Sequence, residues 1–273
     1  MPTFTHEPTQ TTRSILLTGA SGGIGAALAA AYAAPGVMLH LGGLDARRLE
    51  AVADRCRSLG ASVATRRQDV ADKNGMADWV AGADAESDGL DLVIANAGIY
   101  LPADEVGEAT AADIRREFEI NALGVLNTVL PAIEAMRRRR HGHLALMSSL
   151  SSFRGMGLMP AYCASKAAVR VWGEGLRDQL APHNVRVTII CPGHVATPIC
   201  NMRGRGVLTP DHAARLIRAG IDANRPRIAF PTLLYAYLLL SSALPPNIIE
   251  LVRRLKRRRG DRHETRAGAD GLA

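Results

Sequence analysis

A glycine-rich segment between a short apolar run and an alanine-rich stretch restricts this chain to a narrow set of folds. Residues 14–17 are typical of a buried strand, residues 18–25 read TGASGGIG, and residues 26–34 have high helix propensity. Glycines at a strand-to-helix turn allow a tight reversal and a close approach of the backbone to a ligand. The helix that follows presents free amide groups and a partial positive charge, which favour a phosphate. The segment therefore predicts a nucleotide site at the first turn of an α/β fold, with a generic glycine-rich turn as the alternative.

Apolar runs and helical stretches alternate along the rest of the chain. We expect strands at residues 14–17, 37–41, 62–66, 90–95, 143–147, 185–191 and 228–230. We expect helices at residues 26–34, 45–59, 111–120, 122–140 and 160–181. Asp45 is the predicted N-cap of the second helix. Continuous apolar strands between helices predict an α/β fold with a single doubly wound, Rossmann-type parallel sheet of about seven strands and helices on both faces.

Tyr162 and Lys166 stand four residues apart on the predicted helix at 160–181, and Ser149 stands thirteen residues before the tyrosine. The spacing places phenol and ammonium on one face of the helix. A free phenol has a pKa near ~10, and a nearby cation lowers that pKa toward neutral pH. The serine follows a predicted strand, where its hydroxyl could hydrogen-bond the same substrate oxygen. The trio is therefore a candidate for moving a proton on and off a carbonyl or alcohol oxygen, although a tyrosine–lysine pair alone is common on solvated helices.

Four segments, in order and at suitable spacing, resemble the signatures of the short-chain dehydrogenase/reductase family. They are TGASGGIG at 18–25, NAG at 96–98, the Ser149–Tyr162–Lys166 set, and PGHVAT at 192–197. The resemblance implies an NAD(P)-dependent oxidoreductase that transfers a hydride between nicotinamide and a secondary alcohol or ketone. Tyr162 would exchange the proton, Ser149 would orient the substrate oxygen, and Lys166 would contact the nicotinamide ribose. Some members of this fold family are nucleotide-binding regulators or scaffolds without turnover, but those usually lose the tyrosine or the lysine.

Further positions are assigned by this resemblance. Asn121, within EINALG, matches the fourth catalytic position, which helps hold a water that leads to the lysine; the alternative is a helix asparagine that interrupts the backbone ladder. Asp69 matches the position that meets the adenine amino group, and the alternative is an aspartate that caps the next helix. Asn96 would chiefly stabilise the central strands, and Thr197 would lie near the carboxamide. The predicted cofactor-binding residues are Gly19, Ser21, Gly22, Gly23, Ile24, Gly25, Asp69, Val70, Asn96, Ala97, Gly98, Tyr162, Lys166, Pro192, Gly193, Val195 and Thr197, and no metal ligand is expected.

The choice between NAD and NADP depends on the end of the second strand. A carboxylate there holds the ribose 2′-hydroxyl, whereas an arginine favours the 2′-phosphate. Leu44 stands where NADP-preferring members often carry arginine, Gly22 stands where another basic residue sometimes occurs, and no acid precedes Leu44. Arg47, Arg48 or Arg67 could reach a phosphate, although solvated helix arginines explain them equally well. On balance we expect NADP rather than NAD.

The sequence indicates less clearly which residues would contact the substrate. The apolar residues between the serine and the tyrosine are Leu150, Phe153, Met156, Leu158 and Met159. They could line a pocket for an apolar alcohol or ketone, or they could be core contacts. Residues 194–207 are expected to form a mobile region beside that pocket.

Composition places the chain among ordinary globular proteins, with 47% apolar and 22% charged residues. The first 13 residues lack a basic segment followed by an apolar one, and the four cysteines have no metal-ligand spacing. We therefore expect a cytoplasmic protein with reduced thiols and, from the family resemblance, a homodimer or homotetramer. Nucleic-acid binding is not expected, because the arginines lack interleaved aromatic residues.

The basic balance belongs mainly to the C-terminal end. Residues 251–273 hold eight of the Lys and Arg residues and three of the acids, in a chain of net charge +7. Residues 228–249 carry no charge, and six of the seven residues at 253–259 are basic. Prolines limit the apolar helix to about 13 residues or ~20 Å, which is too short to span a bilayer of ~30 Å. A helix at a membrane surface is one reading, and a helix buried against the substrate region or a subunit interface is the favoured one.

These features predict four segments. They are a flexible N-terminal segment at 1–13, a Rossmann-fold catalytic domain at 14–230, an apolar and then basic helical extension at 231–259, and a disordered tail at 260–273.

Overall fold

The computed structural model describes residues 13–101, 109–197, 206–245 and 247, and its strands form one parallel sheet. The sheet has seven strands in the order β3-β2-β1-β4-β5-β6-β7. Their bounds are β1 Ser14–Leu17, β2 Met38–Gly43, β3 Ser62–Arg67, β4 Leu92–Ala95, β5 His143–Met147, β6 Arg186–Pro192 and β7 Arg227–Phe230. The predicted doubly wound, Rossmann-type sheet is confirmed, and each strand bound lies within two residues of its expected place.

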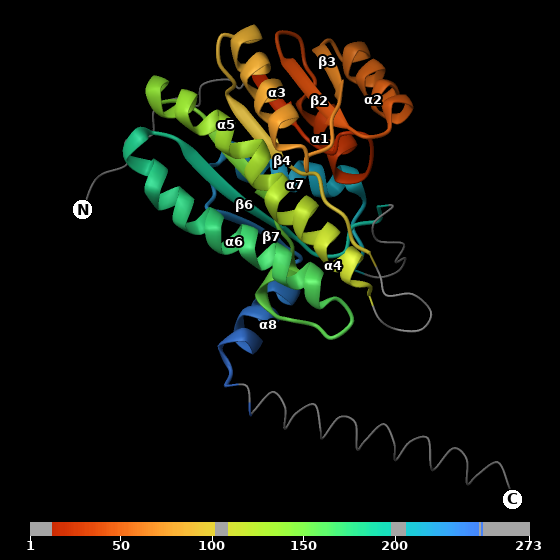
Figure 1. The fold of residues 1–273 in the computed structure, drawn as a ribbon, viewed down its shortest axis with the longest axis vertical. Coiled ribbons are helices and arrows are strands. Elements are labelled where there is room, and N and C mark those ends of the chain that lie inside the picture. Colours follow the sequence, from red (N-terminus) through yellow and green to blue (C-terminus); the bar gives the residue numbers. More distant parts are fainter. Residues whose placement is uncertain (1–12, 102–108, 198–205, 246, 248–273) are drawn as a thin grey trace, which may run out of the picture.

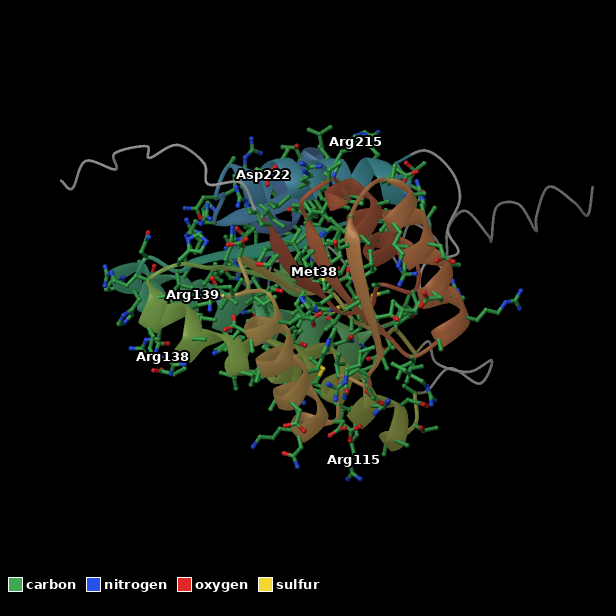
Figure 2. The ribbon with its side chains drawn as sticks, turned by 90° about the horizontal axis from the view of Figure 1, so that it is seen from above. Met38, Arg115, Arg138, Arg139, Arg215 and Asp222 are labelled. Carbon is green, nitrogen blue, oxygen red and sulfur yellow. The ribbon has the colours of Figure 1, made fainter. Side chains whose placement is uncertain are left out.

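Helices connect the strands and cover both faces of the sheet (Figure 1). The α-helices are α1 Gly23–Tyr32, α2 Ala46–Ser58, α3 Lys73–Glu86, α4 Ala111–Phe118, α5 Gly124–Arg139, α6 Pro160–Leu180, α7 Pro210–Asp222 and α8 Thr232–Ala243. Three short segments of other helix types are the π-turn η1 Glu119–Leu123 and the 3₁₀ turns η2 Leu150–Phe153 and η3 Ala181–His183. Charged side chains on the helix surfaces, such as Arg115 and Arg138, point away from the body of the protein (Figure 2).

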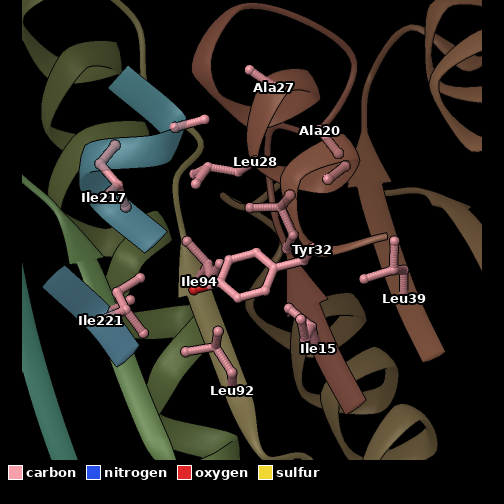
Figure 3. Close-up of a cluster of buried hydrophobic side chains, with 14 of the residues drawn as sticks. Ile15, Ala20, Ala27, Leu28, Tyr32, Leu39, Leu92, Ile94, Ile217 and Ile221 are labelled. Carbon is pink, nitrogen blue, oxygen red and sulfur yellow. The ribbon is translucent and has the colours of Figure 1, made fainter. Parts of the chain in front are cut away.

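Two hydrophobic cores lie on opposite faces of the sheet, because successive strand residues point to opposite sides. Ile15 and Leu17 of β1 belong to a core with α1, α2 and α7, whereas Leu16 belongs to a core with α3, α5 and α6. Figure 3 shows the first core, in which the ring of Tyr32 lies between Ile15, Ile94 and Ile221. Burial on both faces explains why the inner strands are continuous apolar runs, whereas the edge strand β3 has no buried residue.

Three features of the helices differ from the sequence-based expectations. Helices α3 and α7 were not predicted, and their N-caps are Asp72 and Thr209, whose side chains accept amide bonds from Gly75 and His212. The two helices expected at 111–120 and 122–140 are instead joined without a gap, because η1 continues α4 into α5 as a π-turn. The expected discontinuity at Asn121 is therefore a change of helix type. Asp45 caps α2, as predicted.

Helix α8 is covered on one face only. Leu234, Tyr235 and Leu238 pack on a third hydrophobic cluster formed by η2 and β6, and Arg227 of β7 donates a 2.8 Å hydrogen bond to the Tyr235 hydroxyl. The opposite face exposes Leu233, Tyr237, Leu240 and Leu244. The favoured expectation of a buried helix therefore holds only for the face with Leu234, Tyr235 and Leu238, and Ser241 is the one residue of α8 that is fully buried. The basic residues at 253–259, the predicted tail at 260–273 and all but the last residue of the predicted N-terminal segment at 1–13 lie outside the described residues.

Candidate active site

A cavity of about 360 Å³ opens at the carboxyl ends of the strands, where the chain order reverses between β1 and β4. Ligands of doubly wound folds bind at this position. The predicted site residues that line it are Gly19, Ser21, Gly22, Gly23, Ile24, Gly25, Asp69, Val70, Asn96, Ala97, Gly98, Ser149, Tyr162, Lys166, Pro192, Gly193, Val195 and Thr197. Residues from six different strand ends therefore meet around one space, and among the predicted site residues only Asn121 is absent from its described lining.

The glycine loop has the geometry that its composition predicts. Gly19 and Gly23 have φ angles of +67° and +55°, a region that favours glycine. A Cβ on Gly25 would overlap the carbonyl oxygen of Gly19, so only glycine lets α1 approach the end of β1 this closely. Helix α1 starts here with Gly22 as N-cap and makes no side-chain cap bond within the described chain. Its first amide groups and the positive end of its dipole are thus available to an anion in the cavity.

Asn96 ties the ends of the two central strands together. Its side-chain amide donates to the carbonyl oxygens of Thr18 and Gly19 at 3.0 and 3.2 Å. In return, the Thr18 hydroxyl accepts from the amides of Asn96 and Ala97, each at 3.1 Å. These hydrogen bonds fix the glycine loop relative to β4, in agreement with the structural role expected for Asn96.

Two adjacent serines at the end of β5 have different environments. The Ser148 hydroxyl donates to the carbonyl oxygen of Lys166 at 2.8 Å, which holds α6 against the strand. The Ser149 hydroxyl accepts from the amide of Ser151 at 3.1 Å and donates a long 3.5 Å bond to the carbonyl of Pro192. Ser149 is therefore the serine whose hydroxyl is more easily released to a ligand, as its spacing from Tyr162 predicts.

Tyr162 and Lys166 lie on the first turns of α6, which begins at Pro160, a residue suited to the first helical position. The Lys166 ammonium lies 5.9 Å from the centroid of the Tyr162 ring and donates to the carbonyl oxygen of Met147 at 3.1 Å. Burial of the side chain lowers the pKa of Lys166 to about 8. The Tyr162 ring also packs edge-on against Tyr100, with 5.6 Å between centroids. The structure thus brings together phenol, ammonium and serine on one side of the cavity.

Asn121 lies behind the cavity, in the middle of the π-turn η1. Its side chain accepts from the amide of Ile99 and donates to the carbonyl of Ile99, both at 2.8 Å. The position of a Cβ on Gly98 would be 3.0 Å from both the Asn121 Oδ1 and the Lys166 Nζ. Glycine at 98 therefore allows Asn121 and the lysine to approach the same point, and Asn121 anchors the segment at Gly98 and Ile99 that lines the cavity.

Asp69, at the end of β3, does not cap the following helix, so the alternative reading of this residue is wrong. Its carboxylate accepts from the amide of Ala71 at 2.9 Å and from Arg116 of α4 at 2.8 Å. Both Asp69 and Arg116 line the cavity.

The resemblance noted in the sequence is confirmed by a family model, described as short chain dehydrogenase, that matches residues 13–206. The chain belongs to the short-chain dehydrogenase/reductase family. An uncharacterised oxidoreductase of Myxococcus xanthus is 32% identical to this dehydrogenase over 89% of this chain and 96% of that protein. The 17-beta-hydroxysteroid dehydrogenase 13 of Rattus norvegicus is 28% identical over 89% of this chain and 83% of its own length. A short-chain dehydrogenase from Sphingobium yanoikuyae, solved in complex with NADPH, has a TM-score of 0.73 and 25% identity, covering 86% of this chain and 97% of that one.

Membership of the short-chain dehydrogenase/reductase family makes this protein an oxidoreductase and an enzyme that uses a nicotinamide dinucleotide, NAD or NADP. No group of residues able to hold a metal ion occurs among the described residues. Cys56, Cys163 and Cys191 are free and buried, whereas Cys200 lies outside the described chain. In the part of the dehydrogenase that is described, no helix is long and apolar enough to cross a membrane.

The structure adds residues to the site that the motifs do not include. They are Gly43, Gln68, Ile99, Arg116, Ile120 and Met147. Four of them adjoin predicted strand ends or the NAG motif, so their positions alone could have indicated them. Arg116 and Ile120 had no such signal, because they come from α4 and η1, whose approach to the cavity depends on the tertiary fold.

The apolar residues between Ser149 and Tyr162 divide into two groups, and the described cavity lining includes none of them. Leu150 and Phe153 are buried in the cluster beneath α8, so they are core residues. Leu158 is 84% exposed, and Met156 and Met159 are half-buried. Only this second group is free to contact a substrate. Most of the region expected to be mobile, residues 198–205, lies outside the described chain. Val195 and Leu208, which flank residues 198–205, form a β-bridge.

Proposed function

We propose that this short-chain dehydrogenase transfers a hydride between NADP and an apolar secondary alcohol or ketone, with Tyr162 as the proton donor or acceptor. The observation that carries the proposal is the convergence of Ser149, Tyr162 and Lys166 on the cavity that the glycine loop also lines. A nucleotide cradle without this trio would support binding alone. The trio beside the cradle supports catalysis.

The residues around the cavity suit a dinucleotide. The open amides of α1 beside Gly19 and Gly23 would hold the pyrophosphate, and the end of β3 at Asp69 and Val70 would hold the adenine. Lys166 and Thr197 would contact the nicotinamide ribose and carboxamide. When bound, the nicotinamide supplies or accepts the hydride. The remaining chemistry is a proton transfer, and the protein's own side chains perform it.

Proton transfer would use three side chains. Tyr162 donates its phenolic proton to the substrate oxygen in reduction and accepts a proton there in oxidation. The protonated form of Lys166 favours the phenolate of Tyr162 electrostatically, and the Ser149 hydroxyl orients the substrate oxygen. Asn121 supports the arrangement through Ile99 and Gly98, and a water bound beside it would connect Lys166 to solvent. General acid–base assistance of this kind contributes about 10²–10⁴-fold to the rate.

Replacement of the phenol tests the proposed role directly. Tyr162→Phe removes only the hydroxyl, so turnover should fall by about 10²-fold or more, while NADPH binding measured by nucleotide fluorescence should change little. Ser149→Ala should also lower turnover, and Ser148→Ala provides the matched comparison with its neighbour. Wild-type kcat in Tyr162→Phe would refute the assignment.

The preference for NADP rests on Arg48. A Cβ on Gly22 would be 2.8 Å from a guanidinium nitrogen of Arg48, so this arginine of α2 lies directly over the glycine loop. Arg48 lines the cavity with Gly43 and Leu44, and among its described lining residues the only carboxylate is Asp69, which is bound to Arg116. A cation and no free acid at this end of the cavity favour a 2′-phosphate.

Comparison of NADPH with NADH tests this preference. The wild-type enzyme should bind NADPH more tightly, and Arg48→Ser should reduce that advantage by about tenfold, the effect of a lost charge-assisted contact. The neighbouring exposed Arg47→Ser is the control and should leave the ratio unchanged. An intrinsic preference for NADH would contradict the proposal.

The substrate class is proposed from the apolar surroundings and the relatives. Tyr100 packs edge-on against Tyr162, and Met156, Leu158 and Met159 are exposed or half-buried in the segment before α6. Two relatives are named as dehydrogenases of 17-beta-hydroxysteroids and of estradiol. A panel of steroid ketones, medium-chain ketones and polar keto acids, followed by loss of NADPH absorbance, should show turnover of the apolar members.

We also propose a cytoplasmic homodimer or homotetramer, whose mass light scattering would identify.

A peripheral membrane contact is proposed for the exposed face of α8. Leu233, Tyr237, Leu240 and Leu244 follow a helical spacing and are 88, 58, 72 and 45% exposed. Helix α8 carries no charge, and six basic residues follow at 253–259 in the sequence. An apolar helix face that is followed in the sequence by basic residues matches an anionic lipid surface, to which each Lys or Arg contributes about 1 kcal/mol. A second copy is a poorer occupant, because two chains that each carry a net charge of +7 repel one another.

Co-sedimentation with vesicles tests the membrane contact. The full chain should bind vesicles that contain phosphatidylglycerol and not those of phosphatidylcholine alone. Leu233→Ser with Leu240→Ser should abolish binding, and Leu59→Ser with Leu130→Ser, two exposed leucines of other helices, should not. Absence of binding would end the proposal. A dimer that is lost only in the α8 variant would assign this face to a second copy instead.

A further inference from the structure

The end of β3 is held from across the cavity by a residue that no sequence motif includes. Arg116 of α4 donates a 2.8 Å hydrogen bond to the Asp69 Oδ2, although the two residues are 47 positions apart in the sequence. The other carboxylate oxygen accepts from the amide of Ala71 at 2.9 Å. The Asp69 side chain is one third exposed, and its remaining acceptor directions are open to the cavity that it lines.

The backbone beside Asp69 is also fixed by α5. Asn127 donates a 2.9 Å bond to the carbonyl oxygen of Val70. The side chain of Val70 packs on Gly124, where a Cβ would be only 3.1 Å from the Cβ of Val70. The position of Asp69 is therefore set jointly by its own loop and by the α4–α5 pair, so the carboxylate has one orientation rather than several.

The charge state of this carboxylate follows from the same contacts. Partial burial would raise the pKa of Asp69, but the bonds from the Ala71 amide and Arg116 outweigh it and hold the pKa of that carboxyl below its usual range. An ionised carboxylate only accepts hydrogen bonds. It therefore attracts an amino group at the base edge and repels a carbonyl oxygen there.

We propose that Arg116 is a positioning residue that fixes Asp69 so that the enzyme selects an adenine dinucleotide against its hypoxanthine analogue. The inference rests on the proposed cofactor site and names the side chain that controls its base specificity. Adenine presents a donor amino group where hypoxanthine presents an acceptor oxygen, and the purine rings are otherwise alike. Discrimination between the two bases thus depends on where the carboxylate points.

Fluorescence titration with NADPH and with reduced nicotinamide hypoxanthine dinucleotide phosphate tests this without any substrate. The wild-type ratio of dissociation constants should be on the order of tenfold in favour of NADPH, as for one charge-assisted hydrogen bond. Arg116→Met should reduce that ratio to about twofold. Arg115→Met is the matched control, since Arg115 is exposed and points away from the protein (Figure 2), and it should leave the ratio unchanged.

A second variant changes the other partner of the same hydrogen bond. Asp69→Asn places an amide that can donate to a carbonyl oxygen, so it should shift the ratio toward the hypoxanthine analogue. In that background Arg116→Met should have no further effect on the ratio. A purely structural role of Arg116 would weaken both dinucleotides equally, and an unchanged ratio in Arg116→Met would overturn the inference. Failure of the wild-type enzyme to bind either dinucleotide would instead overturn the proposed function.

Discussion

Lys166 is a buried cation, and its burial lowers the free energy of unfolding of the protein. Its ammonium has one described hydrogen bond, to the carbonyl oxygen of Met147, and the side chain is 3% exposed. A buried ammonium favours its neutral form, and for this reason the pKa of Lys166 falls to about 8. At neutral pH the lysine is nevertheless charged, so the folded enzyme retains a destabilising group in the position that the proposed chemistry requires.

Lys166→Met should therefore raise the free energy of unfolding at pH 7 by roughly 1–3 kcal/mol while removing turnover. In an unfolded chain the lysine pKa is near ~10.4. Between that value and about 8, the unfolded chain holds a proton that the folded one has released, so the stability of the wild-type enzyme rises with pH in this window. The advantage of the variant should shrink over the same range. Urea unfolding without cofactor measures both effects.

The control is Lys73→Met, which changes an exposed lysine at the start of α3. Its stability should stay close to that of the wild-type enzyme at every pH. Equal stability of Lys166→Met and the wild-type enzyme at pH 7 would mean that the buried ammonium costs the fold nothing.

Where a motif fixes both residue type and spacing, the sequence indicates which side chains lie close together. Ser149, Tyr162 and Lys166 meet at one cavity because a strand end and a helix start impose their separation. Arg116 and Glu117 were not predicted, since their roles depend on which side of α4 faces the site. Residues three or four positions apart share one face of a helix. The sequence AADIRREF carries charged residues on every face of α4, so it does not indicate which face meets the site.

At the scale of elements, α4 is attached to the segment that follows β4 by a buried carboxylate. Glu117 is 3% exposed and accepts a 2.8 Å bond from the amide of Leu101. One turn later Asn121 bonds both backbone groups of Ile99. The two residues therefore hold the segment that carries Tyr100 against Tyr162. Burial raises the pKa of Glu117, so keeping this carboxylate charged at neutral pH has a cost.

Two substitutions separate the hydrogen bond from the charge. Glu117→Gln keeps an acceptor for Leu101 and should match or exceed the wild-type stability at pH 7, whereas Glu117→Leu leaves that amide unpaired and should cost about 1–3 kcal/mol. Because the folded pKa of Glu117 is raised, wild-type stability from this group increases as pH falls through it, and any advantage of Glu117→Gln should disappear there. Chemical unfolding at pH 7 and at acidic pH gives the comparison.

The matched control is Glu134→Gln, an exposed carboxylate on α5 whose ion pair with Arg138 is open to water. Such pairs contribute little, so this variant should remain near the wild-type stability at both pH values. Equal losses for Glu117→Gln and Glu117→Leu would show that the carboxylate charge, rather than the hydrogen bond, holds Leu101.

At the scale of the whole molecule, the fold could be predicted almost completely. Short, mostly apolar runs and the glycine loop specify a parallel sheet with buried inner strands, and the strand order then follows from the topology of doubly wound folds. Helices α3 and α7 escaped prediction because much of their sequence consists of alanine, glycine and charged residues, although both place apolar residues at helical spacing, such as Ile217 and Ile221 in α7. The division of α8 into a packed and an exposed face could not be predicted, since apolar residues surround the helix.

The π-turn at Glu119–Leu123 makes the junction between α4 and α5 tolerant of a one-residue change in chain length. A π-turn holds one residue more than an α-helix of the same rise, so deletion of Ala122 would allow α4, η1 and α5 to join as one regular α-helix. The backbone hydrogen bonds would improve. Because a π-turn absorbs its additional residue within about one turn, α4 would keep its facing relative to α5, and Arg116 and Glu117 would still point toward Asp69 and Leu101. A chain one residue shorter at this point would gain a more regular helix and would change chiefly the turn in which Asn121 bonds Ile99.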